Sequence, residues 1–236
     1  MATVAGARGD AASPLQRPRA LLIGGVAGLV AFVVFAFVVS RNVTHPFVQP
    51  LDDAWRALVG SDHGPETAPL PMFFQYLGEV PGAIALVILM LVLVIVRRWR
   101  SALFILAGFL GSTLVAQVAK NMVNRPRPAA GDGLFGPLFP VDHGSFPSGH
   151  AVTVGFIAVG VAALIPYARR WIWWIVAALL AVGVVWQRTL INAHWFSDTI
   201  AGLVAGSATT LILWWAFAPL LARDRRRTIT KDTNAS

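Results

Sequence analysis

The sequence predicts an all-α integral membrane protein, a bundle of six transmembrane helices. Of its 236 residues, 56% are hydrophobic and only 13% are charged, whereas a soluble domain usually carries about 25% charged residues. Six apolar stretches have the length of about 17–25 residues that a helix needs to cross a bilayer. We expect these helices at residues 20–40, 80–96, 102–118, 151–167, 171–186 and 199–222.

The first and last stretches set the limits of one helical domain. The first follows Arg17 and Arg19, and it is longer than the apolar region of about 7–15 residues in a signal peptide, so we expect a retained anchor. The chain then divides into a tail at 1–19, a six-span domain at 20–222 and a basic tail at 223–236. Both tails are polar, and we expect them to be solvated or disordered.

The distribution of basic residues predicts the orientation in the membrane. Hydrophilic segments alternate between the two sides, and thirteen of the 19 Lys and Arg residues fall on the side that holds both tails. The positive-inside rule assigns that side to the cytoplasm. A bacterial cytoplasmic membrane with cytoplasmic termini is the expected location. The other six cations are then extracytoplasmic, and most of them belong to the motifs described below.

Composition and spacing also disfavour several classes of site. The chain contains no cysteine, which excludes disulfides and thiolate metal sites. The net charge of +8 follows the membrane topology and forms no single basic patch, so we expect no nucleic-acid partner. The remaining loop histidines, His45, His63 and His143, have no standard ligand spacing, and no metal site is predicted.

A pair of glycines in the last predicted helix indicates close helix packing. Gly202 and Gly206 form a GxxxG pattern, in which the missing side chains let two helix backbones approach each other. The pattern alone does not establish a dimer, and the oligomeric state stays open.

Two cations lie where the third predicted helix ends. Lys120 follows this helix, and Arg127 comes seven residues later, between Pro126 and Pro128. Proline fixes its own φ angle and biases the preceding residue towards an extended conformation, so the chain should leave the helix abruptly. Alone, the two cations would be interpreted as snorkelling anchors. An arginine fork also matches phosphate oxygens, and a lysine adds a point charge.

A short polar motif immediately precedes the fourth predicted helix. It consists of Pro147, Ser148, Gly149 and His150. Ser148 is a candidate N-cap, and Gly149 lets a ligand approach the backbone. Because a helix start presents free N–H groups and the positive end of the dipole, the motif favours an anion. A cap followed by a structural histidine is the alternative if the motif is considered alone.

The third motif contains a histidine and an aspartate four residues apart. On a helix, His194 and Asp198 would share one face. Asp198 could then accept the Nδ1–H of His194 and leave Nε2 as a directed nucleophile. An unbroken helix would place Arg188 about 120° away from His194, so we expect a turn between them, with Asn192 as a cap of the next helix. A structural His–Asp cap would leave Arg188 unexplained.

The ordered motifs K-x6-RP, PSGH and R-x5-H-x3-D resemble the type 2 phosphatidic acid phosphatase family, which shares its site with the vanadium haloperoxidases. They occur in the family's order between Lys120 and Asp198, and the six-span plan extends the resemblance to most of the chain. A helical core of that family is therefore expected. One position differs, because the family commonly has Ser before the third-motif arginine, where this chain has Gln187. The difference concerns one minor phosphate contact.

The resemblance implies a role for each motif residue. His194 would attack phosphorus and form a phosphohistidine, Asp198 would orient it, and His150 would protonate the leaving group. Water would then release phosphate, so no metal and no cofactor is expected. The phosphoryl oxygens would be held by Lys120, Arg127, Ser148, Gly149 and Arg188.

The expected function is hydrolysis of a lipid phosphate at the outer face of the membrane. The resemblance implies a phosphate or pyrophosphate monoester such as a polyprenyl pyrophosphate, phosphatidylglycerol phosphate or phosphatidic acid. The partners are then this substrate and the bilayer. Two alternatives stay open: a lipid phosphotransferase that uses the same intermediate, and a non-catalytic anion or lipid transporter. A transporter would not need the pair of His194 and Asp198, and no internal repeat of the kind common in transporters is evident.

Overall fold

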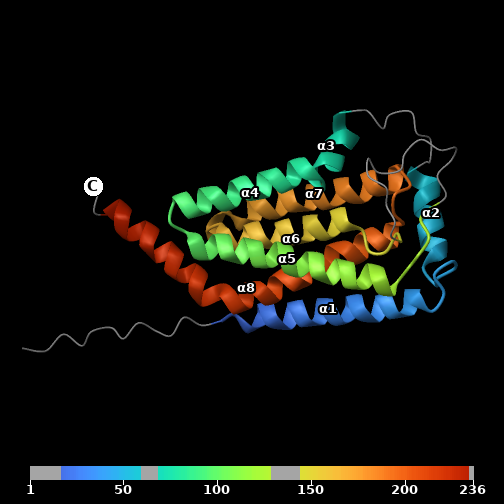
Figure 1. Ribbon diagram of the computed structural model, residues 1–236, viewed down its shortest axis with the longest axis horizontal. Helices are drawn as coiled ribbons and strands as arrows, with labels where there is room; N and C mark the ends of the chain where they lie inside the picture. The colour runs from blue at the N-terminus through green and yellow to red at the C-terminus, as the bar shows by residue number, and fades with distance from the viewer. Residues whose placement is uncertain (1–16, 60–68, 129–143, 234–236) are drawn as a thin grey trace, which may run out of the picture.

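The computed structural model describes residues 17–59, 69–128 and 144–233, and within these ranges it contains helices and connecting segments but no strand. The all-α prediction is therefore confirmed (Figure 1). In chain order the elements are α1 (Arg19–Ser40), α2 (Gln49–Val59), α3 (Pro69–Leu77), α4 (Val80–Ile95), α5 (Trp99–Met122), α6 (Gly149–Leu164), the 3-10 turn η1 (Tyr167–Arg169), α7 (Arg170–Leu190) and α8 (Phe196–Thr233).

Each of the six predicted apolar stretches coincides with a helix, namely α1, α4, α5, α6, α7 and α8. Four described segments are long and apolar enough to cross a bilayer: α1, α5, η1 with α7, and the first 30 residues of α8. The pair of α3 and α4 meets the same criterion as one span bent by 56°. Helix α6 is shorter, at 16 residues. The fold is compatible with six spans, and that number stays a prediction.

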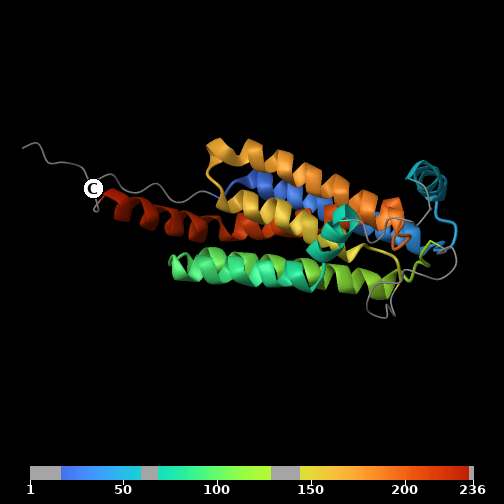
Figure 2. The ribbon, with the colours of Figure 1, turned by 90° about the horizontal axis from the view of Figure 1, so that it is seen from above.

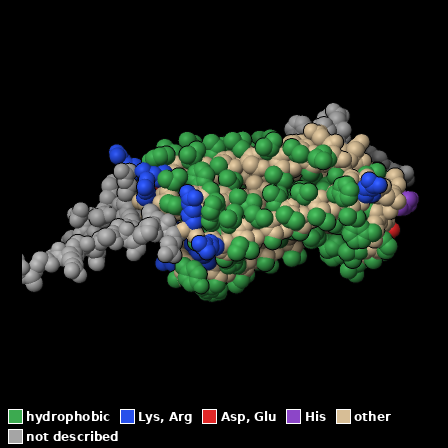
Figure 3. Space-filling view, turned by 90° about the horizontal axis from the view of Figure 1, so that it is seen from below, with side chains coloured by type: hydrophobic (Ala, Val, Ile, Leu, Met, Phe, Trp, Pro, Cys, Tyr) green, Lys and Arg blue, Asp and Glu red, His purple; other side chains and the backbone are tan. Residues whose placement is uncertain are grey.

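Large apolar side chains face outward along the bundle. Phe37 on α1 is 62% exposed, Leu114 on α5 is 64% exposed, and Leu179 on α7 is 67% exposed. Apolar side chains cover the length of the face in Figure 3, and most of its Lys and Arg side chains lie near one end. Exposure of so much apolar surface would be unfavourable in water. The surface is therefore that of a multi-pass membrane protein.

Helix α8 lies at the centre of the bundle and packs against α1, α5 and α6 (Figure 2). Its contact with α6 depends on the two glycines of the GxxxG pattern. A Cβ atom at Gly202 would lie 2.6 Å from the carbonyl oxygen of Ser148, and one at Gly206 would lie 2.0 Å from that of Val152. The predicted close packing is confirmed, and it occurs between two helices of the same chain.

Helix α8 continues beyond the predicted domain limit at residue 222. We expected a solvated or disordered tail there, but the backbone is helical to Thr233. After Pro219, which lies inside the helix, no Gly or Pro interrupts the chain, and arginine is a good helix former. Asp224 also ties the helix to α5, because its carboxylate accepts the backbone N–H of Ser101 at 2.9 Å and pairs with Arg100 at 3.1 Å.

The outer segment between α1 and α4 contains two short helices, which lie at the end of the bundle where α5 ends and α6 begins (Figure 1). Helix α2 packs on α7 and α8: the indole of Trp55 donates to Thr189 Oγ1 at 2.9 Å and stacks on Phe196 with 4.5 Å between ring centroids. Helix α3 packs on α7, where a Cβ atom at Gly183 would lie 1.9 Å from the ring of Phe74. Both helices are thereby brought beside the three motifs.

Candidate active site

The three sequence motifs meet at one end of the bundle. The first lies at the end of α5 and in the extended segment after it, the second at the start of α6, and the third in the connection from α7 to α8. The backbone N–H of Ser148 donates to the carbonyl oxygen of Asp198 at 3.1 Å, which joins the second motif to the third. The guanidinium of Arg127 donates to the carbonyl oxygen of Ala193 at 2.7 Å, which joins the first motif to the third.

The connection from α7 to α8 contains the turn that the sequence predicted. Helix α7 ends at Leu190, and the backbone N–H groups of Ala193 and His194 both donate to the carbonyl oxygen of Arg188, at 3.1 and 3.2 Å. Asn192 has a φ angle of 50°, a left-handed conformation that asparagine tolerates better than most residues. It therefore forms the turn. It is not the cap that we expected, since α8 begins four residues later.

Three cations surround the proposed nucleophile. Burial lowers the pKa of His194 well below its usual range, and the nearby charges of Arg188, Arg127 and Lys120 lower it further. The ring is only 5% exposed. His194 is therefore held in its neutral form, which is the form that can act as a nucleophile.

Several hydrogen-bond donors beside this ring have no partner among the described residues. They are the buried Nε atoms of Arg127 and Arg188 and the hydroxyl of Ser148. Ser148 occupies the N-cap position of α6, as predicted, but its side chain makes no capping bond. A Cβ atom added at Gly149 would meet nothing within 4 Å. The start of α6 thus combines open space, a free hydroxyl and the positive end of a helix, all of which suit an anion.

His150 and Arg188 share a partner on α3. The Nε2 atom of His150 lies 3.0 Å from the backbone carbonyl oxygen of Gln75 and 3.1 Å from Nη1 of Arg188. The same Arg188 atom donates to the side-chain oxygen of Gln75 at 2.6 Å. Nε2 can donate to the carbonyl when it carries a hydrogen or accept from Arg188 when it does not. Gln75 therefore contacts two of the predicted site residues.

Gln187, where the family commonly has serine, faces this same glutamine. Its side chain is buried, and its Nε2 donates to the Gln75 side-chain oxygen at 3.1 Å. The side-chain oxygen of Gln75 therefore accepts two hydrogen bonds, one from Arg188 and one from Gln187.

The predicted hydrogen bond between His194 and Asp198 is replaced by a different one. His194 Nδ1 lies 2.6 Å from the backbone carbonyl oxygen of Ser145. A carbonyl can only accept, so Nδ1 carries the hydrogen and Nε2 presents its lone pair. The expectation was wrong because it assumed one helix through both residues, whereas α8 begins only at Phe196. His194 therefore lies on the preceding turn.

Asp198 is nevertheless close to the nucleophile, because both contact Ser145. The hydroxyl of Ser145 donates to the Asp198 carboxylate and lies 3.5 Å from His194 Nδ1. Asp198 also accepts the backbone N–H of Trp195 at 3.2 Å and pairs with Arg125 at 2.8 Å. It thus holds the segments on both sides of the histidine ring without contacting the ring through a direct hydrogen bond.

Sequence reasoning gave no role to four residues that the fold brings to this site, namely Asp52, Gln75, Arg125 and Ser145. Arg125 lies inside the first motif and carries a charge, so it could have been considered from the sequence. Ser145 lies two residues before the second motif, and its hydrogen bond with His194 is through its backbone carbonyl oxygen. Asp52 and Gln75 come from the outer segment, for which no local pattern indicated a neighbour.

Among the described residues, no group of three His, Asp or Glu side chains is placed to hold a metal ion. Of the three loop histidines considered in the sequence, His63 and His143 lie outside the described residues. His45 lies in the connection between α1 and α2.

Fold and site together define a helical membrane protein with a buried histidine beside three cations. The family model of the PAP2 superfamily matches residues 101–221, which include all three motifs. The chain belongs to this superfamily.

Two curated relatives are lipid phosphatases by name. The undecaprenyl-diphosphatase of Sulfolobus acidocaldarius is 29% identical over 122 residues, which cover 50% of this chain and 55% of that protein. The lipid A 1-phosphatase of Rhizobium johnstonii is 34% identical over 112 residues, which cover 45% of this chain and 44% of that protein. The chain spans about half the length of the curated relatives it matches.

Two solved structures share the fold. The PAP2-type phosphatidylglycerolphosphate phosphatase from Bacillus subtilis superposes with a TM-score of 0.65 and 23% identity, covering 80% of this chain and 94% of that one. LpxE from Aquifex aeolicus superposes with a TM-score of 0.53 and 23% identity, covering 68% and 92%. At this identity the likeness concerns the helical architecture.

Proposed function

We propose that this protein is a membrane lipid phosphatase that hydrolyses a phosphate or pyrophosphate monoester of a lipid through a phosphohistidine. The observation that carries the proposal is the neutral, buried ring of His194 beside Lys120, Arg127 and Arg188. A phosphoryl group gains most from positioning and from fixed positive charge. The names of the curated relatives support a lipid substrate.

In the first step, Nε2 of His194 attacks phosphorus while Nδ1–H stays bonded to the Ser145 carbonyl oxygen at 2.6 Å. The positive charge that develops on the ring is balanced by Asp198, which contacts the same serine. The cations and the Ser148 hydroxyl hold the phosphoryl oxygens. The unpartnered Nε atoms of Arg127 and Arg188 and the unpartnered Ser148 hydroxyl support this role. Three side-chain cations supply the positive charge, so we propose that the reaction needs no metal.

His150 is proposed as the general acid. In its protonated form His150 carries a hydrogen on both ring nitrogens. Its Nε2–H, which the Gln75 carbonyl oxygen can hold at 3.0 Å, would pass to the oxygen of the departing lipid alcohol or phosphate and leave a neutral ring. Water then attacks the phosphohistidine, the P–N bond breaks, and the bond electrons return to His194 Nε2. The proton released from water restores His150, and inorganic phosphate leaves.

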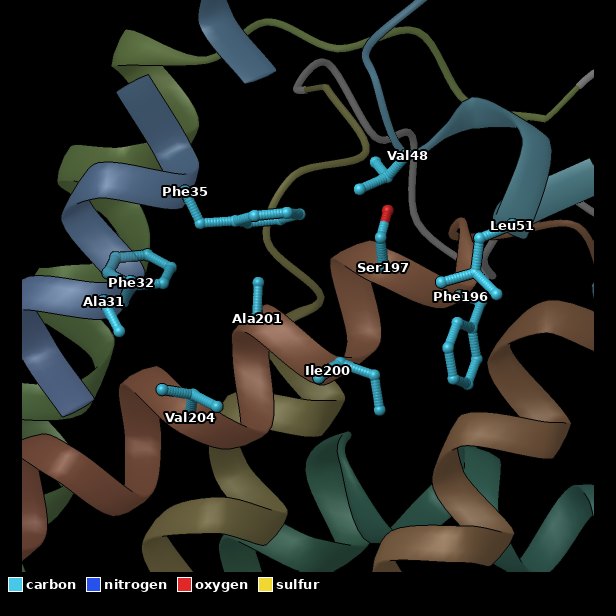
Figure 4. A pocket seen from close by; sticks show the side chains of 10 residues that line it. All are labelled: Ala31, Phe32, Phe35, Val48, Leu51, Phe196, Ser197, Ile200, Ala201 and Val204. Atoms are coloured by element: carbon cyan, nitrogen blue, oxygen red, sulfur yellow. The ribbon is translucent and has the colours of Figure 1, made fainter. Parts of the chain in front are cut away.

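An apolar pocket beside the site supports a lipid substrate. It has a volume of about 330 Å³ and lies between α1, α2 and the start of α8 (Figure 4). Phe35, Leu51 and Ile200 line it, together with Phe196 and Ser197, which lie inside the third motif between His194 and Asp198. A hydrocarbon chain in this pocket would keep its head group near the cations.

The proposed orientation places this end of the bundle outside the cytoplasm. The predicted cytoplasmic turns contain Arg97, Arg98 and Arg169, and they lie at the opposite end of the helices from the motifs. The cytoplasmic membrane of a bacterium is the proposed location.

The test is phosphate release by the purified full-length protein in detergent, with a chelator present. The panel contains phosphatidic acid, phosphatidylglycerol phosphate and a polyprenyl pyrophosphate. We expect turnover of at least one lipid, and a loss of about 10³-fold or more in His194→Ala, with full activity in the control His45→Ala.

Four other results would overturn parts of the proposal. Unchanged turnover in His194→Ala would remove the proposed nucleophile, and strict dependence on an added divalent metal would reject the metal-free scheme. Phosphate transfer to an added lipid alcohol in place of water would identify a phosphotransferase. Binding of the lipids without any cleavage would favour a transporter.

A further inference from the structure

A buried charged network lies behind the nucleophile, on the side of Asp198 away from His194. Its centre is Arg125, which is 0% exposed. Nη1 of Arg125 donates to Asp198 and to Ser197 Oγ, both at 2.8 Å. Nη2 donates to Asp52 at 2.7 Å and to the side-chain oxygen of Gln49 at 3.0 Å. One guanidinium thus bridges two carboxylates.

Asp52 joins this network from outside the family core. It lies on α2, whereas the superfamily match begins at residue 101. Its side chain is 0% exposed and accepts the backbone N–H of Ser197 at 2.8 Å and the Ser197 hydroxyl at 2.7 Å. The first N–H groups of a helix have no partner within the helix. Asp52 therefore caps α8 from another helix, beside the turn that carries His194.

The charges in this network do not cancel. Two carboxylates face one guanidinium, so the group of Asp52, Arg125 and Asp198 carries a net charge of −1 when both acids are ionised. Without Asp52, Arg125 would pair with Asp198 alone, and the group would be neutral. The negative charge next to Ser145, and through it next to His194, therefore depends on Asp52.

We propose that Asp52 and Arg125 are positioning residues for the phosphoryl-transfer reaction: they hold Asp198 in place and keep its negative charge available to His194. They do not touch the substrate. The inference rests on the proposed function, because it assigns these residues to the nucleophile named there. It also explains why α2 is folded against the start of α8.

The charged groups that face His194 determine the pH at which its ring takes up a proton. Lys120 on α5, Arg127 in the segment after it, and Arg188 on α7 all favour the neutral ring. His150 on α6 lies beside Arg188. The Ser145 carbonyl oxygen favours the protonated ring. We expect the negative charge of Asp198 on α8, which is linked to that ring through Ser145, to do the same. Weakening Asp198 should therefore lower the pH at which His194 takes up a proton.

The test compares two neighbouring substitutions on α2. Asp52→Asn removes the buried charge with little change in size. Asp53→Asn makes the same change one residue away, on an exposed side chain that accepts a hydrogen bond from Gln49 at 2.9 Å. We expect Asp52→Asn to lower kcat about tenfold or more, with KM within about threefold, and to move the acid limb of kcat/KM to lower pH by on the order of half a unit. Asp53→Asn should change none of these.

A second control separates charge from packing. Ser197→Ala removes a hydroxyl that contacts both Asp52 and Arg125 but leaves every charge in place. It should lower the melting temperature without moving the acid limb. If Asp52→Asn does not fold, Asp52→Glu and Asp52→Gln form a second pair of equal size, and only the Gln variant should move the limb.

The closing measurement does not require turnover. NMR titration of the labelled His194 ring in the full-length protein gives its pKa directly, and we expect a lower pKa in Asp52→Asn than in wild type. Equal values of pKa and kcat in Asp52→Asn and Asp53→Asn would overturn the inference, as would a change in KM alone. If the wild type releases no phosphate from any lipid, the proposed function fails, and the titration still decides the network.

Discussion

His194 donates its Nδ1–H to the backbone carbonyl oxygen of Ser145, 2.6 Å away, while the hydroxyl of the same serine bonds Asp198. One residue thus links the proposed nucleophile to its acid. The orientation of the ring depends on a main-chain atom, which a side-chain substitution at Ser145 does not remove. Asp198 is therefore linked to His194 through Ser145, and not by the direct hydrogen bond that the helical spacing predicted.

The first prediction concerns the separate roles of the carbonyl oxygen and the hydroxyl of Ser145. Ser145→Ala keeps the carbonyl oxygen that orients His194 and loses only the hydroxyl bond to Asp198. We expect kcat to fall about tenfold, against about 10³–10⁴-fold for Asp198→Asn, which removes the charge that balances the histidinium. Rates of phosphate release and melting temperatures of both variants check the prediction. Equal losses of kcat in the two variants would show that the Ser145 hydroxyl, and not its carbonyl oxygen, orients the His194 ring.

The second prediction is a pH dependence of stability. Burial and three cations depress the pKa of His194 in the folded protein below its unfolded value of about 6.5. The neutral ring is favoured by folding, so its contribution is present above pH 6.5 and is lost as the pH falls, because the unfolded chain binds the extra proton. We expect the wild-type melting temperature to drop more between pH 7 and 5 than that of His194→Asn, by about 2–4 °C.

The exposed His45 provides the control for that measurement. His45→Asn should keep the wild-type slope of melting temperature against pH. A His194→Asn variant that also keeps this slope would contradict the assignment of a neutral buried ring.

The third prediction concerns Gln75, whose side-chain oxygen lies 2.6 Å from Arg188 Nη1. A phosphoryl oxygen bound by Arg188 must compete with this contact. Gln75→Ala removes the competitor, and we expect KM for a lipid phosphate to fall by about two- to tenfold. Phe73→Ala on the exposed side of the same helix is the matched control, with unchanged KM. A higher KM in Gln75→Ala would show instead that the glutamine contributes to substrate binding.

The fourth prediction tests the packing of α6 on α8. Gly206→Ala places a Cβ atom 2.0 Å from the carbonyl oxygen of Val152, so the helices must separate. Gly24→Ala makes the same change on α1, where the added atom meets only Leu211 at 3.9 Å. Overpacking of this kind costs on the order of 1–3 kcal/mol in the free energy of unfolding. We therefore expect Gly206→Ala to lower the melting temperature by several degrees and Gly24→Ala to keep or raise it. Similar melting curves for both variants would contradict the packing argument.

The six long apolar helices could be predicted from the local sequence pattern. Apolar runs long enough for a bilayer predicted α1, α4, α5, α6, α7 and α8, because membrane helices must satisfy their backbone hydrogen bonds within one segment. The turn after Arg188 also followed from helical geometry. The helical end of α8 did not follow, since basic composition alone distinguishes a solvated helix poorly from a disordered tail.

The chemical types in the site were likewise present in the sequence, as three motifs with four cations, two histidines and an aspartate. Only the tertiary structure decided which atoms meet. His194 bonds a carbonyl 49 residues away, and Asp52 contacts Ser197 across 145 residues. Periodicity reports which face of a helix is apolar, but a contact between distant segments depends on how helices pack. That packing placed Gln75 on Arg188 and made Arg125 the link between two acids, and neither relation has a local signature in the chain.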